Sequence, residues 1–360
     1  MNHVPYRWQA AAGLRLFLLA CVLASVAGCR TAPRPGTFAA RHGDEIMLAG
    51  RMVRTGTPVV LWTDPGGYDG YRVERRFSPY DESAWETSKF LVKDLSTPNR
   101  YNLRRAGLTE AQVERVRGGG WDLPLLQEVV DQFVLHYDVA GTSRQCFKVL
   151  HDQRGLSVHF LLDLDGTIYQ TLDLKERAWH ATSSNTRSVG IEIANVGAYG
   201  DSTAAPLRDW YRRDPDGGTR LVIPTRFGDG GVRNTNLVLR PDRPDPVSGS
   251  IHGRSLVQYD LTPQQYEALI RLTAALCSVF PKMACNYPRD ATGALLRTRL
   301  PDTELEAFGG VLGHFHIQTN KVDPGPAFQW DRVIEGARRL LRPMGPGGEK
   351  PATRLVGPRP

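Results

Sequence analysis

Residues 157–172, SVHFLLDLDGTIYQTL, decide the fold. Two apolar runs flank Asp165-Gly166, a dipeptide typical of the two-residue turn that joins antiparallel strands. The sequence therefore predicts a β-hairpin, with one strand over 157–164 and the other over 167–172.

Further strands and helices are predicted on both sides of this hairpin. Residues 133–135 form an apolar strand that ends at His136, and 189–194 form a second buried strand. A helix should begin at Thr142 or Ser143 and stop at Gly155. Thr262-Pro263-Gln264-Gln265 has the cap, first-turn proline and capping-box residue of a longer helix, and a last helix spans 330–341. Strands that alternate with helices predict an α/β fold with a mixed central sheet flanked by helices.

The chain divides into five parts by composition. Residues 1–28 carry a signal peptide, and 29–40 form a short tether with three prolines or glycines. Residues 41–120 form an N-terminal extension with short strands at 45–53 and 57–62, whose role the sequence does not reveal. The main domain spans 121–342 and contains an insertion rich in Arg, Asp, Gly and Pro at about 198–260. The Pro/Gly-rich tail 343–360 is expected to be disordered.

The first residues indicate export. The uncharged run 16–27 follows Arg7 and Arg15, and its 12 residues are too few to span a bilayer but suit a secretory signal. It ends in Val26-Ala27-Gly28-Cys29, which resembles the lipobox of bacterial lipoproteins. The resemblance implies lipidation at Cys29, membrane attachment through the lipid, and a location in the cell envelope facing the periplasm. Arg30 in place of an aspartate favours the outer membrane.

Composition limits the classes of partner. The net charge is +7, but the 38 arginines and seven lysines are scattered and form no basic block, so we expect no nucleic-acid partner. Cys146 is expected to be a small buried hydrophobe. Cys277 and Cys285 lie close together in sequence and could form a disulfide in an oxidising compartment, which their spacing does not decide.

Histidine and aspartate residues point to a metal. His136 ends a buried strand, a histidine pair follows the apolar stretch before Gly313, and Asp323 lies in a loop whose prolines fix the backbone direction. Two imidazoles and one carboxylate suit Zn²⁺ and leave a fourth position for water, as in catalytic sites. His314 and His316 would point to the same side of a strand, so either could be the second ligand.

Five successive motifs between residues 121 and 340 resemble the type-2 N-acetylmuramoyl-L-alanine amidases, which share a fold with peptidoglycan recognition proteins. They are Val134-Leu135-His136-Tyr137, the hairpin from Ser157 to Gln170, Arg177-Ala178-Trp179-His180-Ala181, Val189-Gly190-Ile191-Glu192-Ile193, and Gly313-His314 with Lys321-Val322-Asp323-Pro324-Gly325-Pro326.

The resemblance implies one Zn²⁺ held by His136, His314 and Asp323. It implies Glu192 and Lys321 as catalytic side chains and His180 as a substrate-binding residue. His316 stands where these enzymes often have an aspartate, and the loop from His314 to Asp323 is about one residue shorter than usual. Val158 occupies a position where some phage members have a catalytic tyrosine, which favours the glutamate-using branch.

The activity implied is hydrolysis of the amide between N-acetylmuramic acid and L-alanine in peptidoglycan or muropeptides. One alternative is a module that binds muropeptides without cutting them, but such relatives usually lack a zinc ligand. The other is a zinc peptidase acting within the stem peptide, which the ligand set alone permits. The sequence leaves open whether the substrate is polymeric or soluble.

Overall fold

The computed structural model describes residues 35–36, 40–85, 101–117 and 120–342. The signal peptide, Cys29 and the tail 343–360 lie outside the described residues. The chain divides into two compact units between Arg41 and His42. Every helix and strand described in the following paragraphs belongs to the second unit. No helix in the described part of the chain has both the length and the apolar character that crossing a membrane requires.

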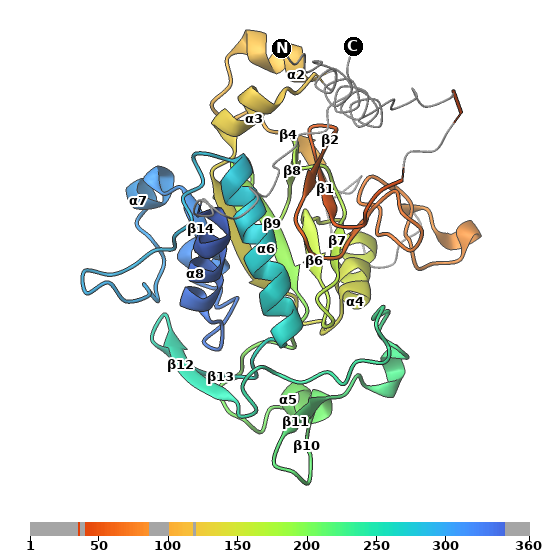
Figure 1. The fold of residues 1–360 in the computed structure, drawn as a ribbon, viewed down its shortest axis with the longest axis vertical. Helices are drawn as coiled ribbons and strands as arrows, with labels where there is room; N and C mark the ends of the chain where they lie inside the picture. Colours follow the sequence, from red (N-terminus) through yellow and green to blue (C-terminus); the bar gives the residue numbers. More distant parts are fainter. Residues whose placement is uncertain (1–34, 37–39, 86–100, 118–119, 343–360) are drawn as a thin grey trace, which may run out of the picture. The chain divides into compact units, whose positions relative to one another are not determined.

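A six-stranded mixed sheet forms the centre of this unit (Figure 1). Neighbouring strands are parallel except for the pair β6 and β7. The predicted α/β fold with a mixed sheet is therefore confirmed. In spatial order the strands are β14 (Gly310–Gly313), β5 (Gln132–Tyr137), β9 (Ser188–Ile193), β6 (Phe160–Leu162), β7 (Ile168–Gln170) and β3 (Val59–Leu61).

The predicted hairpin is present, but its loop has three residues instead of two. Leu162 pairs with Ile168, and the backbone N–H of Asp163 donates to Thr167 O at 2.9 Å. Residues 164–166 are thus the loop, and Gly166 takes φ +84° at its last position. A glycine in the left-handed region is what a three-residue hairpin loop requires there.

Capping residues set the helix starts as the sequence predicts. Helix α6 (Pro263–Val279) begins after Thr262, whose Oγ1 accepts from Gln265 N while Gln265 Oε1 accepts from Thr262 N. Helix α8 (Trp330–Leu341) has the predicted bounds. Helix α4 (Ser143–Phe147) is capped by Thr142 and continues as a π-helical segment, η3 (Lys148–Gln153).

The two faces of the sheet have different roles. Phe133 and Leu135 of β5, with Ile191 of β9, belong to the apolar core that includes residues of α6 and α8; Figure 1 shows α6 crossing in front of the strands. Alternate residues of a strand point to opposite faces. His136 and Glu192 are direct partners in the β5–β9 register, so both side chains lie on the other face.

Part of the N-terminal extension is built into the sheet. Strand β3 is the edge strand beside β7, and β4 (Tyr101–Leu103) pairs antiparallel with β8 (Glu176–Ala178). Among the described residues before β5, the remaining elements are the hairpin β1 (Glu45–Leu48) and β2 (Arg51–Arg54), the short 3₁₀ helix η1 (Tyr80–Glu82), α2 (Glu110–Arg117) and α3 (Leu123–Val129).

Apolar residues of the insertion, among them Leu207, Trp210 and Leu221, form one cluster with Leu164 and Ala194 of the main domain. The elements of the insertion are α5 (Ala205–Trp210), β10 (Tyr211–Arg213), β11 (Thr219–Leu221), η5 (Thr225–Phe227), β12 (Val247–Ile251) and β13 (Arg254–Gln258). Three short elements complete the described chain: η4 (Thr182–Ser184), α7 (Asp302–Ala307) and η6 (His314–His316). Cys277 and Cys285 are free thiols, and Cys146 is a buried one.

Candidate active site

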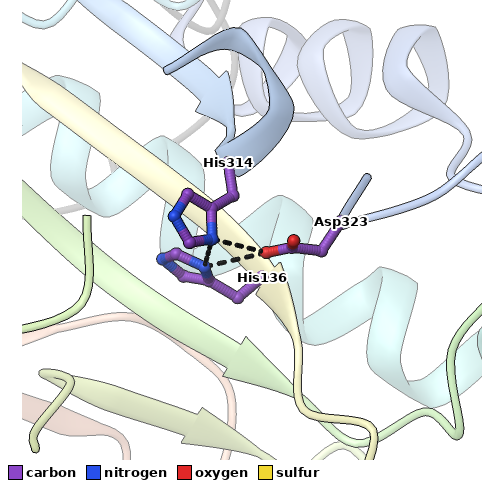
Figure 2. A group of neighbouring side chains, drawn as sticks. All are labelled: His136, His314 and Asp323. Carbon is purple, nitrogen blue, oxygen red and sulfur yellow. Dashed lines mark hydrogen bonds and ion pairs between the residues drawn. The ribbon is translucent and has the colours of Figure 1, made fainter. Parts of the chain in front are cut away.

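His136, His314 and Asp323 converge on one point, as Figure 2 shows. His136 Nδ1 lies 2.9 Å from His314 Nδ1 and 2.9 Å from Asp323 Oδ2, and His314 Nδ1 lies 3.0 Å from the same oxygen. All three residues are buried. Three ligand atoms this close, from two imidazoles and one carboxylate, form a group that could hold a metal ion.

The fold brings these residues together from distant parts of the chain. His136 lies near the end of β5, and His314 follows the end of β14, its parallel neighbour. Asp323 lies in the following loop, where Phe315 N donates to its carbonyl oxygen at 3.3 Å. In open α/β sheets, ligands bind beyond the carboxyl ends of the strands. The site lies at that edge.

The outward-facing ring nitrogens of both histidines have partners as well. His136 Nε2 lies 3.0 Å from His180 Nδ1, and His314 Nε2 lies 2.6 Å from Gln318 Oε1. Metal-binding histidines usually donate their second ring N–H in this way, which fixes the tautomer and leaves the other nitrogen free for the ion. Both rings therefore suit a metal bound through Nδ1.

His316 is excluded as a ligand by its own contacts. Its Nδ1 accepts from Gly313 N at 2.9 Å, and its Nε2 donates to Leu296 O at 2.8 Å. The expectation that His314 and His316 share one side of a strand is wrong, because β14 ends at Gly313 and the histidines lie on the 3₁₀ turn η6. With three residues per turn, positions two apart point in different directions.

A cleft of about 500 Å³ opens beside the three candidate ligands. Glu192, Lys321 and His180, all expected at the site, line it together with the ligands. The cleft also exposes two arginines, Arg154 and Arg177, and the Arg177 guanidinium lies 4.4 Å from the centre of the Trp179 ring. Its wall therefore carries three cationic side chains.

Glu192 has the environment of a proton acceptor. Its Oε2 is shielded from solvent and has no hydrogen-bond partner among the residues that the structure describes. Burial, followed by repulsion from Asp323, raises the pKa of Glu192 well above its usual value. A carboxylate that is poorly solvated and unpaired is a stronger base than one in water.

The pKa values of Asp323 and His136 are shifted downward, in contrast to that of Glu192. Burial opposes ionisation of Asp323, but His314 and His136 outweigh it and hold the pKa of Asp323 below its usual range. Burial, then repulsion from His314, lowers the pKa of His136 to about 4. An ionised carboxylate and a neutral imidazole are the protonation states that bind a metal.

His180 and His159 differ in their access to the cleft. His180 lines it, and its ring lies against Gly190, where an added Cβ would come within 2.5 Å of the ring. Only glycine at 190 leaves room for this histidine. His159 is fully buried, and its Nδ1 accepts from Gly190 N at 3.1 Å while Nε2 donates to Glu176 O at 3.0 Å. Its contacts make it a structural residue.

Several residues of the site had no role in the sequence analysis. Gln318 stands four residues after His314, which is a helical spacing, but the sequence did not indicate a turn there. Arg177 is the middle residue of β8 and lies within the motif Arg177-Ala178-Trp179-His180-Ala181, which was a usable signal. No sequence signal marked Arg154, because it is one of 38 arginines scattered along the chain.

The site thus combines three candidate metal ligands, an open cleft and a carboxylate with an unpartnered oxygen, a combination that suits metal-assisted hydrolysis. A family model described as N-acetylmuramoyl-L-alanine amidase matches residues 126–326, more than half of the chain. The chain belongs to this family and is an N-acetylmuramoyl-L-alanine amidase. No curated protein matches the chain.

Solved structures with some similarity carry related names. A selenomethionine derivative of AmpD is 18% identical with a TM-score of 0.30, over 66% of this chain and 90% of that one. AmiD from E. coli, in complex with the substrate anhydro-N-acetylmuramic acid-L-Ala-D-gamma-Glu-L-Lys, is 18% identical with a TM-score of 0.32, over 59% and 61%. The endolysin amidase LysCS from Clostridium intestinale URNW is 16% identical with a TM-score of 0.30, over 59% and 86%.

Proposed function

We propose that the amidase is zinc-dependent, with Zn²⁺ held by His136 Nδ1, His314 Nδ1 and Asp323 Oδ2, and with Glu192 and Lys321 as its catalytic side chains. One observation carries the proposal: the three ligand atoms and the unpaired Glu192 carboxylate face one cleft. Two nitrogens and one oxygen are a donor set typical of catalytic zinc.

The chemistry divides between the ion and the protein. When bound, zinc supplies a water of lowered pKa and polarises the amide carbonyl. Glu192 accepts the proton of the attacking water and passes it to the amine of L-alanine as the C–N bond breaks. Lys321 lies in the same cleft and carries a positive charge that stabilises the oxygen on which negative charge develops.

The substrate class that fits this cleft is the muropeptide unit, either free or within peptidoglycan. A stem peptide carries carboxylates, and Arg154 and Arg177 place positive charge along the cleft wall. His180 is expected to contact the substrate as well. Its Nδ1 and Nε2 already have partners in His136 and Ser188, which favours contact through the ring or through displacement of one partner.

The test is metal dependence, measured on the purified protein. We expect about one zinc per chain, loss of activity on exhaustive chelation, and recovery on adding Zn²⁺ back. His136→Ala should lose both zinc and activity. Full zinc content and full activity in that variant would overturn the assignment of the site.

We also propose that the mature protein is anchored to the envelope through lipid on Cys29. The motif Val26-Ala27-Gly28-Cys29 after a short apolar run supports this. Two or more acyl chains anchor a protein stably, whereas one is marginal. Cys29→Ser should abolish labelling with a fatty-acid probe and move the protein out of the membrane fraction; unchanged partition without label would contradict the proposal.

A further inference from the structure

Arg104, in the N-terminal extension, is fully buried although it carries a charge. It directly follows β4, which pairs with β8 just before the segment that carries His180. Burial lowers the pKa of Arg104 to about 9, so the guanidinium is still protonated at neutral pH. A buried cation is costly unless its N–H groups are hydrogen-bonded, and the partners of Arg104 therefore matter.

Those partners are four backbone carbonyls of the segment around His180, and Nη2 also lies 3.0 Å from His159 Nε2. Nε donates to Leu174 O at 3.1 Å, Nη1 donates to two carbonyls and Nη2 donates to a fourth at 3.0 Å. The last three carbonyls belong to Asn185, Thr186 and Ser188, with the shortest distance, 2.7 Å, to Thr186. One side chain thus fixes both ends of the stretch 174–188.

Two of these residues hold His180 directly. The Asn185 side-chain oxygen accepts from His180 N at 3.0 Å and from Ala181 N at 2.6 Å. Ser188 Oγ lies 3.2 Å from His180 Nε2, on the far side of the ring from His136. The guanidinium therefore sets the backbone from which both restraints on His180 are made.

His180 in turn contacts His136, with 3.0 Å between His180 Nδ1 and His136 Nε2. Because Ser188 holds its Nε2, the His180 ring presents Nδ1 to His136 in a fixed direction. Hydrogen bonds to the second ring nitrogen of a metal-binding histidine affect its metal affinity. We propose that Arg104 is a positioning residue, which acts through Asn185 and His180 to orient His136 toward the metal. This gives the N-terminal extension a role in the site, and it rests on the zinc site proposed above.

The experiment compares zinc affinity and ring geometry in four full-length mature proteins. Arg104→Lys keeps the charge but cannot reach four carbonyls, and Asn185→Ala removes the side-chain acceptor while leaving Arg104 in place. Arg105→Met is the matched control, since Arg105 is exposed and adjacent. Zinc dissociation constants come from competition with a chromogenic chelator, and the histidine ring nitrogens of the metal-free proteins are followed by NMR.

We expect both Arg104→Lys and Asn185→Ala to weaken zinc binding by about 10- to 100-fold and to shift the His180 and His136 ring signals. Arg105→Met should match the wild type in both measurements. If Arg104→Lys fails to fold, the zinc affinity and the ring signals of Asn185→Ala test the proposal.

Folded variants with wild-type zinc affinity and unshifted ring signals would overturn the role of Arg104. A wild-type protein that binds no zinc would instead overturn the proposed zinc site, and the ring signals of the metal-free proteins would still report whether Arg104 positions His180.

Discussion

Replacement of Glu192 by glutamine separates catalysis from metal binding. The side chain keeps its size and its place in β9, but it can no longer accept a proton. A positioned acid–base group contributes roughly 100-fold or more to turnover, so kcat should fall by at least that factor, which corresponds to about 2.7 kcal/mol in the activation barrier.

The structure also predicts what this substitution leaves unchanged. In the described structure Glu192 Oε2 has no hydrogen-bond partner to lose, and Glu192 is not one of the three candidate ligands. Its pKa is raised by burial, so ionisation above the usual carboxyl pKa destabilises the folded metal-free protein. The neutral amide removes that penalty, and the unfolding temperature of the metal-free variant at neutral pH should be equal to that of the wild type or higher.

The assay is steady-state hydrolysis of a defined muropeptide, with zinc measured on the same sample by mass spectrometry. Glu335→Gln on α8 is the matched control, because Glu335 is exposed. Normal turnover with normal zinc in Glu192→Gln would refute the reasoning and remove this residue from the mechanism. Loss of zinc in that variant would place Glu192 in the metal site itself.

Three further predictions test neighbouring parts of the site and fold. His314→Ala should lose the metal while His316→Ala keeps it, measured as zinc per chain; the reverse would mean that the two histidines are wrongly assigned. Lys321→Ala should lower kcat by around 100-fold if its charge meets the developing oxyanion, and unchanged kcat at full zinc content would exclude that role. Burial lowers the pKa of His159 and of His316 to about 3, so each ring is neutral when folded and takes up a proton on unfolding below about pH 6.5. The free energy of unfolding should therefore fall as the pH drops below 6.5, by up to about 1.4 kcal/mol per pH unit for each histidine; denaturant titrations in which it stays constant from pH 7 to 5 would contradict this.

Local signals were enough to predict helices α6 and α8 and strands β5 and β9. The α6 capping box depends only on Thr262 and Gln265, which are three residues apart, and the bounds of α8 follow its apolar spacing. The same holds for β5 and β9, whose apolar runs end at the site. The family motifs then named the ligand set that the geometry brings together.

Long-range contacts were beyond sequence reasoning. Strand β3 pairs with β7 across more than a hundred residues, which no local pattern of Val59 to Leu61 encodes. Arg104 is one of 38 arginines, and only the folded chain shows it buried against four carbonyls. His314 and His316 could not be separated from the residues alone, because the choice depends on a 3₁₀ turn where the pattern continued a strand.

The most direct measurement is mass spectrometry of the products that the zinc-loaded protein releases from a defined muropeptide. An amidase of the proposed mechanism releases the intact stem peptide, with a free amino group on L-alanine, and a saccharide whose lactyl carboxyl is free. Those two masses should appear with the wild type and be greatly reduced with Glu192→Gln at equal zinc content. Shortened stem peptides, or an unchanged muropeptide that remains bound to the protein, would contradict the assignment.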